Sequence, residues 1–172
     1  MSNTGKETVM NQDIVKLSNE LTYRRYLFNK EHSRGVFKEL SIPDYVAMHI
    51  IAEMEKEEDI YSGKAYLQDL AEKMRLTIRQ TSKMVAGLRD RGLLSWAHDG
   101  DGSAGTYVMI TDSGKEILAN QEDNLKKFYG HVIEQFGKEN LIRLLHLMRQ
   151  LESVLQEEAE RIREEESDNG NE

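Results

Sequence analysis

The segment from Thr77 to Lys83 carries the side chains with the most specific chemistry in this chain. The guanidinium of Arg79 can donate two hydrogen bonds to O6 and N7 of guanine, and Gln80 or Ser82 can bond base edges or phosphate oxygens. The ammonium group of Lys83 is suited to phosphate. These residue types predict non-covalent recognition of DNA, with Thr77, Arg79, Gln80, Ser82 and Lys83 as the candidate DNA-binding residues.

An amphipathic helix is predicted to position these side chains. Thr77 stands where an N-cap belongs, and Gln80 follows at the spacing of a capping box. Two sets of residues then lie about 200° apart around the helix axis. The face expected to pack holds Thr81, Met84, Val85 and Leu88, and the presented face holds Arg79, Ser82, Lys83 and Ala86. Taken alone, such a presented face is more often ordinary solvated surface.

The elements around this helix favour DNA binding over plain surface. A helix is predicted over residues 64–74, with an apolar face at helical spacing. Gly92 is placed to end the next helix in a left-handed conformation. Runs 93–97 and 106–110 are separated by strong turn residues and predict a hairpin, after which Thr111 caps another helix. The order helix, helix, hairpin, helix is typical of a winged helix.

The segment LQDLAEKMRLTIRQTSKMVAGLRDRGLLS, followed by the hairpin and ITDSGKEIL, resembles the MarR family of bacterial transcriptional regulators. With its flanking long helices the resemblance covers roughly residues 10–160. It implies a mainly α fold with a small β-hairpin wing, a homodimer that binds double-stranded DNA at a pseudo-palindromic operator, and often release by a small-molecule effector. We therefore expect a DNA-binding transcriptional regulator, and specifically a repressor.

The wing tip departs from the pattern of this family. Members usually carry a D-x-R motif there, whereas the aligned residues are Gly102, Ser103 and Ala104, and no Lys or Arg occurs between Arg91 and Lys115. The wing therefore lacks the usual cation for the minor groove. An alternative function remains, in which a winged-helix dimer with weak DNA affinity acts as a protein-interaction module.

A single MarR-like domain is expected to fill residues 1–172. Residues 41–111 form the winged helix-turn-helix, and residues 166–172 form a disordered acidic tail. Long helices within 10–35 and 112–165 are assigned to dimerisation, with a break at Phe136 and Gly137. After that break an apolar seam suits another packed helix, at Leu141, Leu144, Met148, Leu151 and Leu155.

The resemblance also places an effector cavity where the dimerisation helices meet the DNA-reading lobe. Side chains that could line it are aromatic or soft, namely Tyr23, Tyr26, Phe28, Met48 and His49. Aromatic and methionine residues at helical spacing more often simply pack in a core. Ordinary core packing therefore stays open for each of the five.

Composition restricts the remaining classes of protein. The chain has no cysteine, which excludes disulfides and thiolate metal sites, and it carries no motif of a hydrolase, P-loop protein or metalloprotease. We expect no enzyme, no cofactor and no metal site. We also expect no membrane segment and a cytoplasmic location. The net charge is −8, yet residues 64–96 hold seven basic and three acidic side chains, a net +4, against −3 before them and −9 after them.

Overall fold

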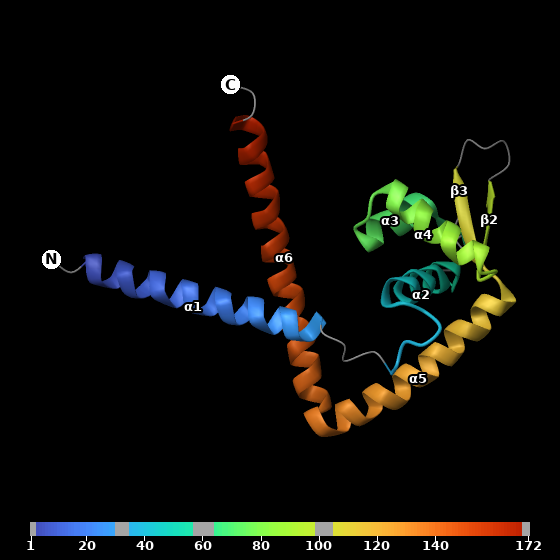
Figure 1. The fold of residues 1–172 in the computed structure, drawn as a ribbon, viewed down its shortest axis with the longest axis horizontal. Helices are drawn as coiled ribbons and strands as arrows, with labels where there is room; N and C mark the ends of the chain where they lie inside the picture. The colour runs from blue at the N-terminus through green and yellow to red at the C-terminus, as the bar shows by residue number, and fades with distance from the viewer. Residues whose placement is uncertain (1–2, 30–34, 57–63, 99–104, 170–172) are drawn as a thin grey trace. The chain divides into compact units, whose positions relative to one another are not determined.

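The computed structural model describes residues 3–29, 35–56, 64–98 and 105–169 (Figure 1). In chain order the elements are α1 (Asn3–Asn29), α2 (Ile42–Lys56), β1 (Ala65–Tyr66), α3 (Leu67–Met74), α4 (Ile78–Asp90), β2 (Leu94–His98), β3 (Thr106–Ile110), α5 (Asp112–Phe136) and α6 (Lys138–Asn169). The chain divides into two compact units, Met1–Gln121 and Glu122–Glu172, which are described separately.

A three-stranded antiparallel sheet of order β1-β3-β2 lies in the first unit. Figure 1 labels its strands β2 and β3. Strands β2 and β3 form the predicted hairpin, and their register pairs Leu94 with Ile110 and His98 with Thr106. Strand β1 corrects the prediction of a helix over 64–74, because α3 begins only at Leu67. Ala65 pairs with Val108 of β3, so the extended conformation of β1 depends on a partner distant in the sequence.

The core of the first unit lies between α2, α3, α4 and the sheet. The predicted packing face of α4 is confirmed, since Thr81, Val85 and Leu88 are buried and Met84 packs partly buried against them. The other fully buried large side chains of this core are Leu40, Met48, Ile51, Leu70 and Val108. Each helix of the winged helix-turn-helix is therefore anchored through one apolar face.

The end of α4 is fixed by the predicted glycine. Gly92 has a φ of 75°, its N–H donates to the carbonyl of Arg89 at 2.7 Å, and the N–H of Leu93 donates to Leu88 at 3.0 Å. This pair of bonds is a Schellman motif. Helix α3 ends with the same pair of bonds, although the left-handed position there is held by Arg75, with a φ of 53°.

Two further helix starts match the sequence. Ser41 accepts the N–H of Asp44 at 3.2 Å at the start of α2. Thr111 accepts the N–H of Gly114 at 3.0 Å at the start of α5, and its hydroxyl donates to the carbonyl of Gly92 at 2.7 Å. The hydroxyl of Thr111 therefore joins the end of α4 to the start of α5.

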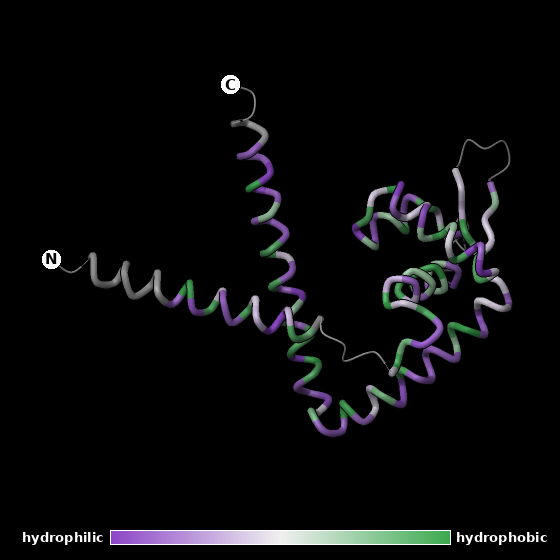
Figure 2. Tube along the Cα trace, viewed as in Figure 1, coloured by the Kyte–Doolittle hydropathy of each residue, from purple (hydrophilic) through white to green (hydrophobic). Residues whose placement is uncertain are grey.

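Helix α5 begins in the first unit and ends in the second, which also holds α6. The predicted break is confirmed, because Gly137 separates the two helices with a φ of 92°. Hydrophobic residues recur along α6 between hydrophilic ones (Figure 2). In the described residues no helix is both long and apolar enough to cross a membrane.

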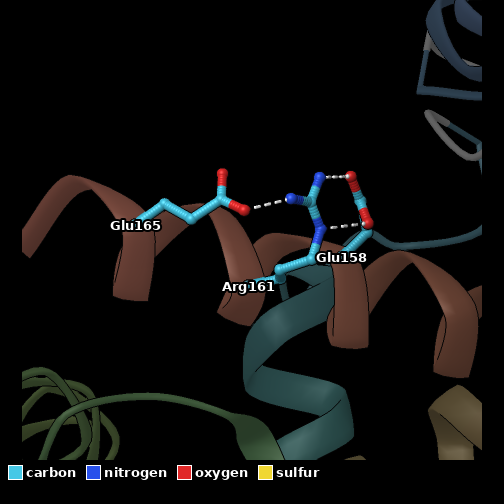
Figure 3. A network of polar contacts seen from close by, with 3 residues as sticks. All are labelled: Glu158, Arg161 and Glu165. Carbon is cyan, nitrogen blue, oxygen red and sulfur yellow. Dashed lines mark hydrogen bonds and ion pairs between the residues drawn. The ribbon is translucent and has the colours of Figure 1, made fainter. Parts of the chain in front are cut away.

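The predicted helix boundaries at the two ends of the chain have different outcomes. Helix α1 is described as far as Asn29, and the end predicted near Gly35 falls on residues 30–34, which lie outside the described part. Helix α6 runs to Asn169, so most of the tail predicted as disordered is helical. Within the predicted part of this helix, Arg161 forms ion pairs with Glu158 and Glu165, one turn before and after it (Figure 3). Residues 170–172 lie outside the described part.

Candidate nucleic-acid interface

Helix α4 starts with the predicted capping box. The N–H of Gln80 donates to Oγ1 of Thr77 at 3.2 Å, and the N–H of Thr77 donates to Oε1 of Gln80 at 2.9 Å. The hydroxyl of Thr77 also lies 3.0 Å from that same Oε1 atom. These bonds satisfy two backbone donors of the first turn and fix where the helix begins.

The presented face of α4 lies where the sequence placed it. Arg79 and Lys83 are exposed, and Ser82 and Ala86 are half-buried, while the opposite face belongs to the core. Of the five predicted DNA-binding residues, Arg79, Ser82 and Lys83 are thus gathered on one side of the first two turns. Thr77 and Gln80 are exposed at the helix start and are engaged with each other.

The cations at the two ends of α4 differ in their partners. Arg89 bonds Asp90 at 2.7 Å and lies over the ring of Trp96, 4.6 Å from its centroid. Arg91, just after the helix, bonds Asp44 at 3.2 Å and the carbonyl of Glu39. Among the described residues, no acidic side chain pairs with Arg79 or Lys83. The positive charge that remains available to a partner is therefore at the N-terminal end.

The capping box limits what Gln80 can do. Bidentate recognition of adenine requires an amide that offers both its oxygen and its nitrogen. The oxygen of Gln80 already accepts hydrogen bonds from Thr77. Only the amide N–H groups of Gln80 remain for DNA, and these can donate to phosphate or to an acceptor on a base.

The base of the wing is ordered by the paired strands. Nδ1 of His98 lies 3.1 Å from the hydroxyl of Thr106 across the last pair of the ladder. The aligned wing-tip residues Gly102, Ser103 and Ala104 lie outside the described residues.

The five predicted pocket residues lie in different surroundings. Met48 on α2 is fully buried in the core, and the ring of His49 stacks on Tyr45 with centroids 5.9 Å apart. The side chains of Tyr23, Tyr26 and Phe28 on α1 are 53%, 55% and 76% exposed. Met48 thus serves as a core residue, whereas the three residues of α1 have most of their surface uncovered.

Two residues with a role in the structure were missed by sequence reasoning. Ile78, the first residue of α4, is 48% exposed and is absent from the core cluster. Glu55 lies in an acidic run that reads as solvated surface, yet its carboxylate accepts the N–H of Ile110 at 2.8 Å. Helical spacing puts Ile78 within about 20° of the buried Val85, so no local signal separates Ile78 from a core residue. No local signal predicts the bond of Glu55 either.

Comparison with known proteins rests on structure, since no protein-family model and no curated protein matches this sequence. A MarR family protein from Bacillus stearothermophilus is 18% identical and covers 85% of this chain and 97% of its own, with a TM-score of 0.58. The PcaV transcriptional regulator from Streptomyces coelicolor is 16% identical and covers 80% and 89%, with a TM-score of 0.60. This chain has the MarR-like winged-helix fold.

A third structure extends the agreement. BpsR from Bordetella bronchiseptica is 14% identical and covers 78% of this chain and 91% of its own, with a TM-score of 0.63. The predicted fold class is confirmed: a mainly helical winged helix-turn-helix with a small sheet and long terminal helices. In the MarR-like fold of this chain, α3 and α4 form the helix-turn-helix, and β2 and β3 form the wing.

Proposed function

We propose that this chain is a sequence-specific DNA-binding transcriptional regulator, a homodimeric repressor released from its operator by a small-molecule effector. The observation that carries the proposal is that Arg79 and Lys83, on the exposed face of a helix whose other face is packed in the core, pair with no acidic side chain of the described residues. A helix-turn-helix presents its second helix to the major groove in this way, with the first turns nearest the bases.

Electrostatics support the choice of this helix. Residues 64–96 carry a net charge of +4, whereas the chain as a whole carries −8. The N-terminal end of α4 adds the positive pole of its dipole close to Arg79. Acidic surface elsewhere opposes random docking on phosphate, so the charge pattern favours one defined binding face over general attraction to DNA.

We assign a role to each of the five predicted residues. Arg79 is assigned to guanine, because its long side chain is exposed and has no acidic partner in the described residues. Ser82, half-buried one turn after Ile78, is assigned to a base edge or phosphate, and Lys83 to phosphate. Thr77 and Gln80 set the start of the helix, and Gln80 can add a donor to phosphate.

A homodimer is favoured by the surface of α6. The predicted seam runs along it, with Leu141 and Leu144 half-buried and Met148, Leu151 and Leu155 from 40% to 54% exposed. A row of partly exposed apolar side chains along one helix is costly in water. The same row of residues on a second copy of the chain can cover it. Two copies of α4 then match a pseudo-palindromic operator.

Effector control is proposed by likeness to structural neighbours. The structure of PcaV contains its natural ligand, and that of BpsR concerns regulation of DNA binding by 6-hydroxynicotinic acid. For this chain we propose that Tyr23, Tyr26, Phe28 and His49 contact an effector. Met48, which is fully buried, would support these residues from within the core rather than contact the effector. The cytoplasm, where DNA is found in a bacterial cell, is the proposed location.

Selection from a random pool of synthetic DNA duplexes by the full-length chain tests this function. A defined site should be enriched, and its affinity should fall as salt rises. Arg79→Ala should cost about 1–3 kcal/mol per half-site and relax base preference. Lys83→Ala should weaken all sequences alike and flatten the salt slope.

Lys115→Ala is the matched control, because it removes a lysine that already pairs with Asp112 at 3.8 Å. It should leave both the affinity and the salt slope almost unchanged. Specific binding that survives in both Arg79→Ala and Lys83→Ala at full strength contradicts the assigned interface. No enrichment of any duplex would favour the alternative, a winged-helix dimer that acts as a protein-interaction module.

A further inference from the structure

Ile78 is a large aliphatic side chain that the core leaves partly uncovered. It is the first residue of α4 and is 48% exposed, while the core cluster and the apolar residues packed against it do not include Ile78. Burying an aliphatic side chain is favourable, so leaving it half in water forgoes stability that the fold could have gained. The side chain thus remains available for an apolar contact with a partner.

The position of Ile78 relates that contact to the cationic face. Successive residues of a helix are about 100° apart, so Ser82 lies about 40° round the axis from Ile78, one turn later. Arg79 follows Ile78 directly, and its exposed guanidinium has no acidic partner in the described part of the chain. An apolar group therefore borders the two predicted base contacts at the end of the helix that enters the groove first.

Double-stranded DNA offers one prominent apolar group in the major groove, the C5-methyl group of thymine. Resting on the function proposed above, we propose that Ile78 determines specificity by contacting a thymine methyl group within each half-site. Arg79 and Ser82 then select the neighbouring bases through hydrogen bonds. The shared chemistry is a C5-methylated pyrimidine, and thymine is its source in unmodified DNA.

Uracil provides a sharp test, because replacing thymine by uracil removes the methyl group and leaves Watson–Crick pairing intact. The probe is the synthetic duplex selected by the full-length chain, with uracil placed at one thymine position at a time. At one position per half-site, affinity should fall about fourfold, the fold-change that corresponds to about 0.8 kcal/mol per buried CH₂ group. With both half-sites substituted, the two losses should multiply.

Variants at Ile78 show whether that residue makes the contact. Ile78→Ala should bind the thymine duplex more weakly and lose the difference between thymine and uracil. Ile78→Val keeps a branched apolar side chain and should retain the difference. Alanine is a better helix former than isoleucine, so Ile78→Ala is expected to fold, which circular dichroism can verify.

Ile42 supplies a matched control in the same chain. It is the first residue of α2, follows the capping residue Ser41, and is also 48% exposed. Ile42→Ala should therefore keep the full response to uracil. The proposal is supported if the uracil effect disappears in Ile78→Ala and persists in Ile42→Ala.

The uracil series separates a loss of the Ile78 contact from a loss of DNA recognition as a whole. Specific binding with no uracil effect at any thymine, or with the same effect in Ile78→Ala, overturns the role of Ile78 alone. A response only to added 5-methylcytosine overturns the assignment to thymine. If no duplex is enriched at all, both the proposed function and the role of Ile78 are overturned.

Discussion

A β-carbon at Gly114 would stand 2.1 Å from the carbonyl oxygen of Leu93, closer than two such atoms can approach. It would also lie 2.8 Å from a methyl carbon of Ile110. Gly114 lies in the first turn of α5, where Thr111 accepts its N–H. The start of α5 therefore packs against the backbone of Leu93, just before β2, only because residue 114 has no side chain.

Gly114→Ala should reduce the free energy of unfolding by about 1–3 kcal/mol, because the backbone must shift to admit a methyl group. Gly130→Ala in the same helix is the control, since a β-carbon there meets nothing within 4 Å. That change should raise stability by about 0.5–1 kcal/mol. Urea denaturation at one fixed protein concentration measures both. Equal effects of the two changes would contradict the close packing at Gly114.

Glu55 stabilises the sheet from α2 by accepting the N–H of Ile110 at 2.8 Å. Glu55→Ala should cost about 1–3 kcal/mol of unfolding free energy, because it leaves a buried N–H without its acceptor. Glu55→Gln retains a carbonyl oxygen and should cost less. Glu53→Ala, which removes a surface ion pair with Lys56, should change the denaturation midpoint little. A loss for Glu53→Ala as large as that for Glu55→Ala would count against this role.

Leu151 lies on the seam of α6 and is 40% exposed. If α6 packs against a second copy, Leu151→Glu places a charge in that interface and should shift the protein from dimer to monomer. Gln150→Glu adds the same charge at an exposed position outside the seam. Sedimentation velocity over a range of concentrations should show dissociation for Leu151→Glu only. An unchanged dimer in Leu151→Glu would exclude this stretch of α6 from the interface.

Hydrogen bonds from Arg161 hold the pKa of Glu158 below its ordinary value of 4.5 (Figure 3). Because the folded-state pKa is the lower one, this pair favours the folded helix above the ordinary pKa. That contribution is lost as the pH falls through the lowered value. The helical content of this part of α6 should therefore decrease in acid.

A titration followed by nuclear magnetic resonance can test this at Glu158 itself. Arg161→Met should return the pKa of Glu158 towards 4.5, since the donor of the hydrogen bonds is removed. Arg163→Met removes a neighbouring charge outside this pair and should leave the lowered pKa in place. A pKa that stays low in Arg161→Met would assign the shift to another group.

The sequence alone determined the elements whose signals lie within a few residues. Thr77 with Gln80 forms the capping box, Gly92 adopts the left-handed conformation, and Gly137 separates two helices. The buried and exposed faces of α4 also follow from helical spacing. These features were predictable because a cap, a positive φ or one side of a helix depends on adjacent residues and on the period of the backbone.

Only the tertiary structure decided the features that join distant segments. Ala65 and Tyr66 form a strand because β3 pairs with them, and Glu55 bonds Ile110 across the core. The long-range bonds of Arg91 to Asp44 and Glu39 withdraw that cation from the binding face, whereas Arg79 remains available. A charge is available to a partner only if no residue of the chain already pairs with it. Such pairing joins residues distant in the sequence, so no local pattern predicts it.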